Sequence, residues 1–266
     1  MIDSPETMIK TIREYGIIPF FKCGVPGWSI EEMTDPSFWF FSSDELGPWD
    51  WKIDAVREGD IAYGKFLGGK AAFATVEFYR HLMNWRRSIP RYRVALGEKY
   101  QAKTASDKLM KGLSPTALEI IRNNGAAESR EIRIALSVAV SPTLLRSLGS
   151  SYKSKLTPSV KKSIADSITQ FLEMGTWTII GDFTRVYRGA DLQYSGWQRS
   201  SFTTPEALFG KDRTIEDAPF WARHFEESSD RDGINVDCSP EESRQLLVEH
   251  VLDMFPGEKK QIERMI

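Results

Sequence analysis

The spacing of apolar residues changes along the chain, and each change marks the edge of a predicted element. Two strand-like runs, 61-IAYGKFL-67 and 70-KAAFATV-76, stand on either side of Gly68-Gly69. A Gly-Gly dipeptide readily takes the positive φ of a tight turn, because neither residue has a Cβ. The pattern therefore predicts a β-hairpin over residues 61–76.

A helix is predicted directly after this hairpin. From Glu77 onward, Phe78, Leu82 and Trp85 recur at the spacing of one apolar helix face. The helix ends on a basic and aromatic sequence, which we expect to close the N-terminal unit and to present charge toward the middle of the chain. The apolar face would leave three arginines toward solvent or a ligand: Arg80, Arg86 and Arg87.

Further helix starts are marked by Ser-Pro and Thr-Pro pairs. Proline suits the first helical turn, and a preceding hydroxyl can cap the free amides of that turn. Ser239 is also followed three residues later by Glu242, the spacing of a capping box, which predicts a helix over residues 240–255. Six pairs precede helix-compatible runs: Ser4-Pro5, Ser114-Pro115, Ser141-Pro142, Thr157-Pro158, Thr204-Pro205 and Ser239-Pro240.

The middle of the chain is predicted to contain helices followed by a two-stranded ribbon. In the longest helix, 157–175, apolar residues repeat at helical spacing, and Gly175 stands where a left-handed C-terminal residue is expected. The helical segments before it are 114–125, 127–136 and a short helix from Pro142. The strand-like runs after it are 176–180, 183–187 and 192–202, with turns expected at Gly181-Asp182 and Arg188-Gly189.

This order of elements is typical of a winged helix-turn-helix, whose third helix can enter a major groove while the wing touches the DNA backbone. Here the helix over residues 157–175 takes the place of that third helix. At its start, the helix dipole and the charges of Lys161 and Lys162 both favour phosphate. Basic residues on an exposed helix are also often merely solvated, and winged helices also serve as protein-interaction modules. The residues expected to contact DNA are Arg86, Arg87, Ser159, Lys161, Lys162, Arg185, Arg188 and Arg199.

The formal net charge of −2 conceals an uneven distribution. Residues 1–79 hold 7 basic and 13 acidic residues, residues 80–213 hold 22 and 11, and residues 214–266 hold 6 and 13. A basic block between acidic flanks suits a polyanion, because neutralising phosphates releases counterions. The alternative is that the basic and acidic parts pair with each other inside the fold.

Several functional classes lack support in the sequence. Cys23 and Cys238 have no CxxC spacing and the three histidines are scattered, which argues against a disulfide framework and a structural zinc site. P-loop, GxGxxG, HExxH and GxSxG patterns are absent, so no cofactor is expected. No apolar run reaches the length of about 18 residues that crosses a bilayer, and the first residues do not resemble a signal peptide. We expect a cytoplasmic protein with no membrane partner.

Four segments resemble the winged-helix DNA glycosylase family typified by AlkZ, and more closely the shorter AlkZ-related proteins. These segments are 47-GPWDW-51, 62-AYGKF-66, 70-KAAFATVEFYRHLMNWRR-87 and 204-TPEALFG-210. The resemblance implies an α+β fold with tandem winged helix-turn-helix modules and small antiparallel hairpins. It also implies ancestry in the recognition of damaged DNA.

The chain departs from that family where the family's chemistry lies. The glycosylases carry a Gln-x-Gln or Gln-x-Asp motif, which helps position a water for cleavage of the base–sugar bond, upstream of the segment corresponding to 38-FWFF-41. The region here reads 25-VPGWSIEEMTDPSFWFF-41 and lacks that motif. Glu31 or Glu32 could orient a water as a general base, so these are the catalytic candidates. An adjacent acidic pair near a helix start is more often a partner of the helix dipole.

Aromatic and acidic residues near the N-terminus leave two further questions open. Exposed tryptophans could stack on an unpaired base, whereas buried ones contribute apolar area to the core, which we favour. Asp50 and Asp54 are one helical turn apart and could pair with Lys or Arg across a cleft. The tryptophans concerned are Trp28, Trp39, Trp49, Trp51 and Trp85.

We expect three parts: an N-terminal winged-helix-like unit over 1–108, a basic winged-helix domain over 109–213, and an acidic C-terminal segment over 214–266. The expected function is binding of duplex or damaged DNA by a diverged relative of the glycosylases, with or without their activity. The alternative is a protein-interaction module without nucleic-acid binding or catalysis. In that case a homodimer could form through the C-terminal helix, whose apolar face would hold Leu246, Leu247, His250, Val251 and Met254.

Overall fold

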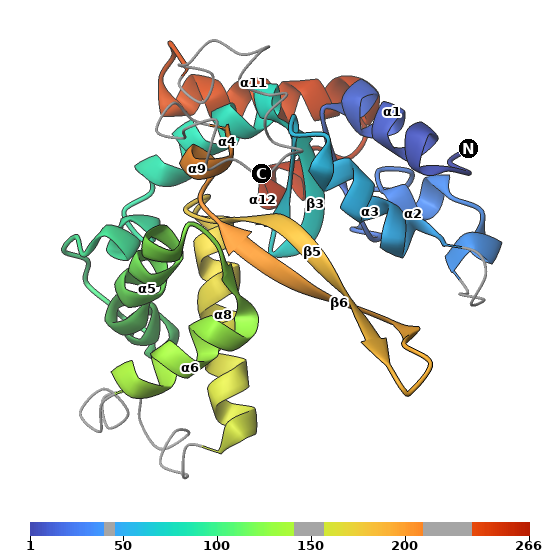
Figure 1. The fold of residues 1–266 in the computed structure, drawn as a ribbon. Coiled ribbons are helices and arrows are strands. Elements are labelled where there is room, and N and C mark those ends of the chain that lie inside the picture. The colour runs from blue at the N-terminus through green and yellow to red at the C-terminus, as the bar shows by residue number, and fades with distance from the viewer. Residues whose placement is uncertain (40–45, 141–156, 210–235) are drawn as a thin grey trace.

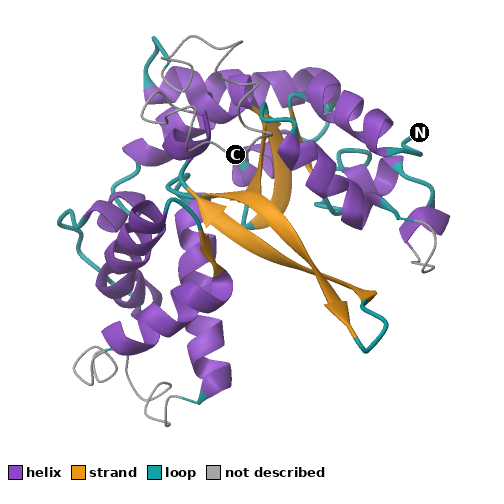
Figure 2. Ribbon diagram, in the orientation of Figure 1, coloured by secondary structure: helices purple, strands orange, loops and turns teal. Residues whose placement is uncertain are grey.

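The computed structural model describes residues 1–39, 46–140, 157–209 and 236–266, which form a mixed α+β fold (Figures 1 and 2). The first unit has an antiparallel sheet of order β1-β3-β2, so its first strand pairs with its last. Its elements are α1 (Pro5–Tyr15), β1 (Ile17–Pro19), α2 (Ile30–Met33), the short 3-10 helix η1 (Pro36–Trp39), α3 (Pro48–Arg57), β2 (Ile61–Leu67) and β3 (Lys70–Thr75).

The second unit repeats this arrangement. Its antiparallel sheet has the order β4-β6-β5, so the strand between its first two helices again pairs with the last strand of a hairpin. Its elements are α5 (Ala105–Asn124), β4 (Ala127–Glu128), α6 (Ser129–Ala139), α8 (Pro158–Met174), β5 (Ile179–Arg188) and β6 (Gln193–Thr203). The β5–β6 hairpin projects beyond the helices as a long ribbon (Figure 1).

Helices outside the two sheets connect and cover the units. The connection consists of α4 (Val76–Ser88) and the short helix η2 (Tyr92–Leu96), and α9 (Pro205–Phe209) follows β6. Near the C-terminus, α11 (Pro240–Met254) packs along α4, and α12 (Lys259–Met265) follows it. None of the described helices is both long and apolar enough to cross a bilayer.

The two units share one apolar core. The helix that precedes the hairpin in each unit packs against the hairpin of the other unit, so that α3 contacts β5 and α8 contacts β2. Tyr63 on β2 makes ring contacts with Phe73 of its own sheet and with Phe183 on β5. The hairpins and these helices therefore form the junction between the units.

Most of the helix starts predicted from hydroxyl-proline pairs are confirmed. The side chains of Ser4, Thr157 and Ser239 accept backbone N–H bonds at the starts of α1, α8 and α11. The 204–205 pair likewise starts α9, while the pair at 141–142 lies outside the described residues. Ser239 also forms the predicted capping box with Glu242.

The predicted start at Ser114 is wrong. Thr104 and Asp107 form a capping box that starts α5 ten residues earlier, and Pro115 lies inside the helix. The Ser114 hydroxyl is buried and donates to the carbonyl of Met110 over 2.6 Å, so it supports the turn before the proline instead of capping a new helix.

The hairpin over residues 61–76 is confirmed, with φ of 55° at Gly68 and 78° at Gly69. The turn expected at Gly181 is wrong, because β5 runs through it with a bulge between Ile180 and Asp182. A Cβ on Gly181 would lie 2.8 Å from Cγ2 of Thr203, which explains the glycine by close packing. The real turn follows Arg188, as predicted.

The left-handed residue after α8 is not the predicted one. Gly175 has φ of −80°, and Thr176 takes the positive φ, 57°. A Cβ on Gly175 would meet Cδ1 of Trp177 at 2.9 Å and Cβ of Tyr92 at 3.1 Å. Gly175 is therefore needed for the close approach of η2 and not for its own backbone angle.

Candidate nucleic-acid interface

The start of α8 presents positive charge to solvent. Thr157 caps the helix by accepting from the amide of Val160, and Pro158 occupies the first helical position. Ser159 and Lys162 are exposed, and Lys161 is partly exposed. Because the first turn carries no acidic residue, the positive end of the helix dipole and the lysine charges add together.

Residues near the C-terminal end of α8 make their contacts inside the protein. Burial raises the pKa of Glu173 to about 7, and its carboxylate accepts the backbone N–H of Lys65 over 3.0 Å. Gln170 donates to the carbonyl of Gly69 over 2.9 Å. Both contacts join α8 to the hairpin of the first unit, so only the first turns of the helix carry the exposed basic residues.

The three arginines predicted for a wing lie on the β5–β6 hairpin and differ in their surroundings. Arg188 is exposed at the end of β5. Arg199 is exposed on β6, and its guanidinium lies 3.7 Å from the carboxylate of Glu128. Arg185 instead turns toward α3, where its Nε lies 3.3 Å from Oδ1 of Asp50. Among the predicted wing residues, Arg188 and Arg199 are therefore the accessible ones.

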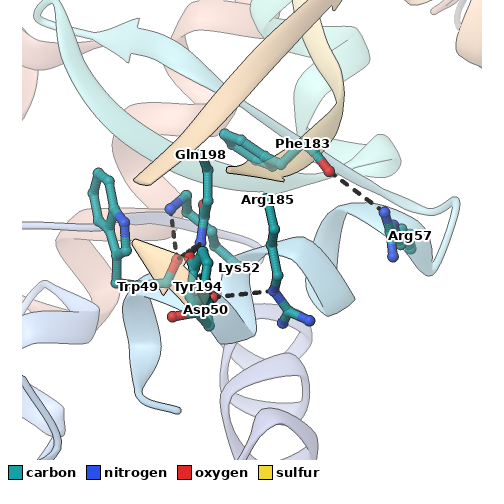
Figure 3. Close-up of polar contacts among 8 residues, drawn as sticks. All are labelled: Trp49, Asp50, Lys52, Arg57, Phe183, Arg185, Tyr194 and Gln198. Atoms are coloured by element: carbon teal, nitrogen blue, oxygen red, sulfur yellow. Dashed lines mark hydrogen bonds and ion pairs between the residues drawn. The ribbon is translucent and has the colours of Figure 1, made fainter. Parts of the chain in front are cut away.

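Asp50 is the centre of a polar cluster between α3 and the β5–β6 hairpin (Figure 3). Its side chain is 1% exposed, and Oδ1 also accepts from the Tyr194 hydroxyl at 2.8 Å and from Nε2 of Gln198 at 3.0 Å. Its Oδ2 has no hydrogen-bond partner within the described segments. This confirms the predicted pairing of Asp50 across the chain, whereas the structure leaves Asp54 exposed.

Lys52 lies beside this cluster with its amine buried. Nζ donates to the carbonyl of Trp49 over 2.5 Å and lies 3.3 Å from the centre of the Trp49 ring (Figure 3). Burial lowers the pKa of Lys52 to about 7, against an opposing effect of the Asp50 charge. The amine is therefore part of the junction and does not face a ligand.

Arg57, at the end of α3, makes the next contact along the wing. Its Nε lies 3.0 Å from Oδ1 of Asp182, and its guanidinium also donates to the carbonyl of Phe183 (Figure 3). A small pocket of about 300 Å³ opens here between α3 and β5. This pair joins an arginine of the acidic N-terminal flank to an aspartate of the basic block, whereas Arg185 and Asp50 pair in the sense expected if the basic and acidic parts neutralise each other.

The helix pattern predicted that Arg86 faces solvent or a ligand, and this prediction is wrong. Arg86 is 7% exposed, and its guanidinium donates to the carbonyl of Met265 at 2.9 Å and to the Tyr92 hydroxyl at 3.3 Å. Burial lowers the pKa of Arg86, with Tyr92 opposing that effect. The C-terminal segment covers this side of α4, and both terminal nitrogens of Arg86 bond within the chain, while its buried Nε has no partner in the described segments.

Arg87 reaches the second unit, in agreement with the expected direction of its charge. It forms an ion pair with Glu206 and donates to the carbonyl of Thr176 over 2.7 Å. Its guanidinium also lies 4.5 Å from the centre of the Trp177 ring. Its contacts explain why an arginine closes α4, independently of any ligand.

The catalytic candidates lie in the single turn of α2. The Ser29 hydroxyl donates to the carboxylate of Glu32 over 2.6 Å, and the Glu31 carboxylate accepts the backbone N–H of Lys22 over 2.9 Å. The Glu32 contact belongs to the helix start, while Glu31 binds the backbone of the loop that precedes α2. Within the described part of the chain, no three His, Cys, Asp or Glu side chains gather as a metal site.

The tryptophans divide between core and surface. Trp28 and Trp51 are buried, while Trp39 and Trp85 are partly buried and Trp49 is 37% exposed. Sequence reasoning did not single out Trp197, which is 62% exposed on β6, and it named neither Tyr194 nor Gln198, two partners of Asp50. The strand alternation that places Arg185 opposite Gln198 was the available signal for those partners.

Comparison with known proteins assigns the chain to a family. Neither the curated proteins nor the solved structures contain a match to this chain. The protein family described as AlkZ related matches residues 2–266, nearly the whole length. The resemblance seen in the hairpin and in α4 thus extends to both units and the C-terminal helices, and the chain belongs to the AlkZ-related family.

Proposed function

We propose that both units are winged-helix modules and that the protein binds duplex DNA through the second one. The repeated architecture supports this proposal. In each unit, a helix, a strand, further helices and a hairpin follow in that order, and the first strand pairs with the last. Such an order is typical of winged helix-turn-helix modules. The family also suggests a relationship to DNA glycosylases.

The observation that carries the DNA-binding proposal is the difference between the two helices that precede the hairpins. The start of α3 holds the buried Asp50 and is covered by the β5–β6 wing. The start of α8 instead holds Lys161 and Lys162, and neither pairs with a carboxylate in the segments that the structure describes. A helix start with uncompensated positive charge suits phosphate. We therefore assign the DNA-facing helix to α8, with Arg188 and Arg199 on the wing as further contacts.

The proposal covers binding and assigns no bond-cleaving residue. The carboxylate of Glu31 is bonded to the backbone of Lys22, and that of Glu32 to the Ser29 hydroxyl. Asp50 has the burial and neighbours of a catalytic carboxylate, but its Oδ1 bonds tie it to the wing. We infer a diverged relative of the glycosylases that keeps the recognition modules, with damaged duplexes as its preferred ligands.

Fluorescence anisotropy of a labelled duplex tests this function. The intact duplex and the same duplex with an abasic site are titrated with protein at several salt concentrations. The proposal predicts binding that weakens steeply as salt rises, because lysine and arginine contacts release counterions from the DNA. Stronger binding of the abasic duplex supports recognition of damage, and no binding to either duplex at low salt contradicts the proposal.

A further inference from the structure

Four polar side chains meet where the start of α11 lies against α4, far from the start of α8 (Figure 1). His81 and Asn84 come from α4, Ser243 comes from α11, and Cys238 stands directly before the N-cap residue Ser239. Ser243 is fully buried, whereas Cys238 and His81 are partly exposed. The cluster therefore combines a thiol that small molecules can reach with an imidazole.

The distances form a connected path from the thiol to the imidazole. Sγ of Cys238 lies 3.1 Å from Oγ of Ser243 and 3.7 Å from Nδ1 of His81. Oγ of Ser243 lies 3.0 Å from the same Nδ1. Asn84 donates one N–H to Oγ of Ser243 and the other to the carbonyl of Cys238, both over 2.9 Å. Because Asn84 donates to this oxygen, the Ser243 proton can point to His81 or to Cys238.

Nδ1 of His81 lies within reach of the thiol proton, and the neutral form of the ring can accept it. Burial lowers the pKa of His81, and Arg80 acts in the same direction while Glu77 opposes it. The imidazole is therefore neutral near pH 7 and has one unprotonated nitrogen. Once the proton has moved, the thiolate of Cys238 is stabilised by the imidazolium, by the Ser243 hydroxyl and by the nearby start of α11.

We propose that Cys238 is a reactive thiol that exchanges with small disulfides, with His81 as its proton acceptor. The proton of Cys238 moves to Nδ1 of His81, directly or through Ser243. The sulfur then attacks one sulfur of the disulfide, a new S–S bond forms as the old one breaks, and the leaving thiolate takes up the proton. The disulfide is the oxidant, and the products are a mixed disulfide at Cys238 and one free thiol. Because the same contacts hold α11 on α4, a group attached to Cys238 loosens that attachment.

Cys23 provides a comparison within the same chain. Its Sγ donates to the carbonyl oxygens of Trp28 at 3.5 Å and Val25 at 3.9 Å. Burial raises the pKa of the Cys23 thiol, against smaller opposing effects. Both thiols are partly exposed, but a thiol that donates to carbonyls and whose pKa is raised keeps its proton, so Cys23 exchanges slowly. These are the only two cysteines in the sequence, so replacing either one isolates the other.

The test follows exchange of the full-length protein with dithiodipyridine by the absorbance of the released thiopyridone, from acidic to neutral pH. Cys238→Ser isolates Cys23, and Cys23→Ser isolates Cys238. We expect Cys238 to react at least about tenfold faster than Cys23 at neutral pH. In the Cys23→Ser protein, His81→Asn should slow Cys238 by about fivefold or more and move the midpoint of the pH profile upward.

His250→Asn is the matched control, because His250 lies on α11 but bonds the carbonyl of Tyr15 instead of the thiol. It should leave the rate of Cys238 unchanged. Equal rates for the two cysteines, or an unchanged rate in His81→Asn, would overturn the proposal. If His81→Asn does not fold, as judged by circular dichroism, Ser243→Ala takes its place and must also slow Cys238. An unchanged rate in that variant counts against the proposal equally.

Discussion

Arg185 and Asp50 are 135 residues apart in the chain, yet Nε of Arg185 lies 3.3 Å from the carboxylate of Asp50. The contact joins the wing of the second unit to the first helix turn of α3. It makes the wing part of the junction between the units along one side, while the tip and the other arginines stay exposed. This relationship determines which basic residues remain for a ligand.

Replacing Asp50 with Asn should destabilise the protein by about 1–3 kcal/mol, because Arg185, Tyr194 and Gln198 lose a charged acceptor in a buried setting. Urea unfolding followed by tryptophan fluorescence measures the change. Asp54→Asn is the matched control, one turn along α3 and exposed. The two variants should differ clearly; equal free energies of unfolding would mean that the Asp50 contacts contribute nothing to the junction.

Lys52→Met should raise stability at and below neutral pH. The pKa of Lys52 is lowered by burial to about 7, so between that pH and the ordinary lysine pKa the unfolded state binds more protons than the folded state. Stability therefore rises with pH across that interval, and the methionine variant lacks this rise. Thermal unfolding from pH 6 to pH 10 checks it, with the exposed Lys10→Met as control. If the stability of the Lys52→Met protein still rises with pH across this interval, the lowered pKa of Lys52 is not its cause.

Glu173→Gln should remove a pH dependence of the opposite sign. The pKa of Glu173 is raised by burial to about 7, so between its ordinary pKa and that value the folded state binds more protons than the unfolded state. Stability then falls as pH rises through this interval. The glutamine keeps an acceptor oxygen for the N–H of Lys65 and should flatten the decline. Unfolding midpoints at pH 5 and pH 7 measure this, and Glu119→Gln on the exposed face of α5 should show no such change.

Arg87→Ala should cost about 1–3 kcal/mol, since it removes bonds to Glu206 and Thr176 in a partly buried place. Arg93→Ala removes an exposed pair with Glu98 and a long contact of 3.4 Å to the carbonyl of Arg87, and it should cost much less stability. Denaturant titration of both variants makes the comparison. If the Arg93 variant loses as much stability as the Arg87 variant, Arg87 has no special part in joining α4 to the second unit.

Local features of this fold can be predicted from sequence, because their causes lie within a few residues. The caps at Ser4, Thr157 and Ser239 and the Gly68-Gly69 turn are examples. The same is true of the apolar face of α8. In each case neighbouring residues satisfy the backbone, so the pattern contains the information.

Features that depend on distant partners are not available from the sequence in this way. Arg86 is buried because the carbonyl of Met265, 179 residues away, accepts its N–H. Gly181 continues a strand because Thr203 packs against it. The position of Asp50 one turn before Asp54 suggested an ionic partner, but only the packing of α3 on β5 selects Arg185.

The homodimer expected through the C-terminal helix is also affected by a distant contact, because α11 packs on α4 within the same chain. Leu247 and Val251 are buried, whereas Leu246 remains 39% exposed. A dimer through this helix would have to use the opposite side of α11. Mass measurement by light scattering on the full-length protein and on Leu246→Glu checks this: a dimer lost in the variant supports it, and a monomer in both contradicts it.

The central claim is that the start of α8 faces DNA, and the most direct measurement is the salt dependence of duplex binding by Lys161→Glu/Lys162→Glu. The control is Lys259→Glu/Lys260→Glu, which makes the same charge change in an adjacent lysine pair at the start of α12. The account predicts weaker binding and a slope of log affinity against log salt that is flatter by about 2 in the α8 variant alone. Equal affinities and slopes for the two variants would contradict it.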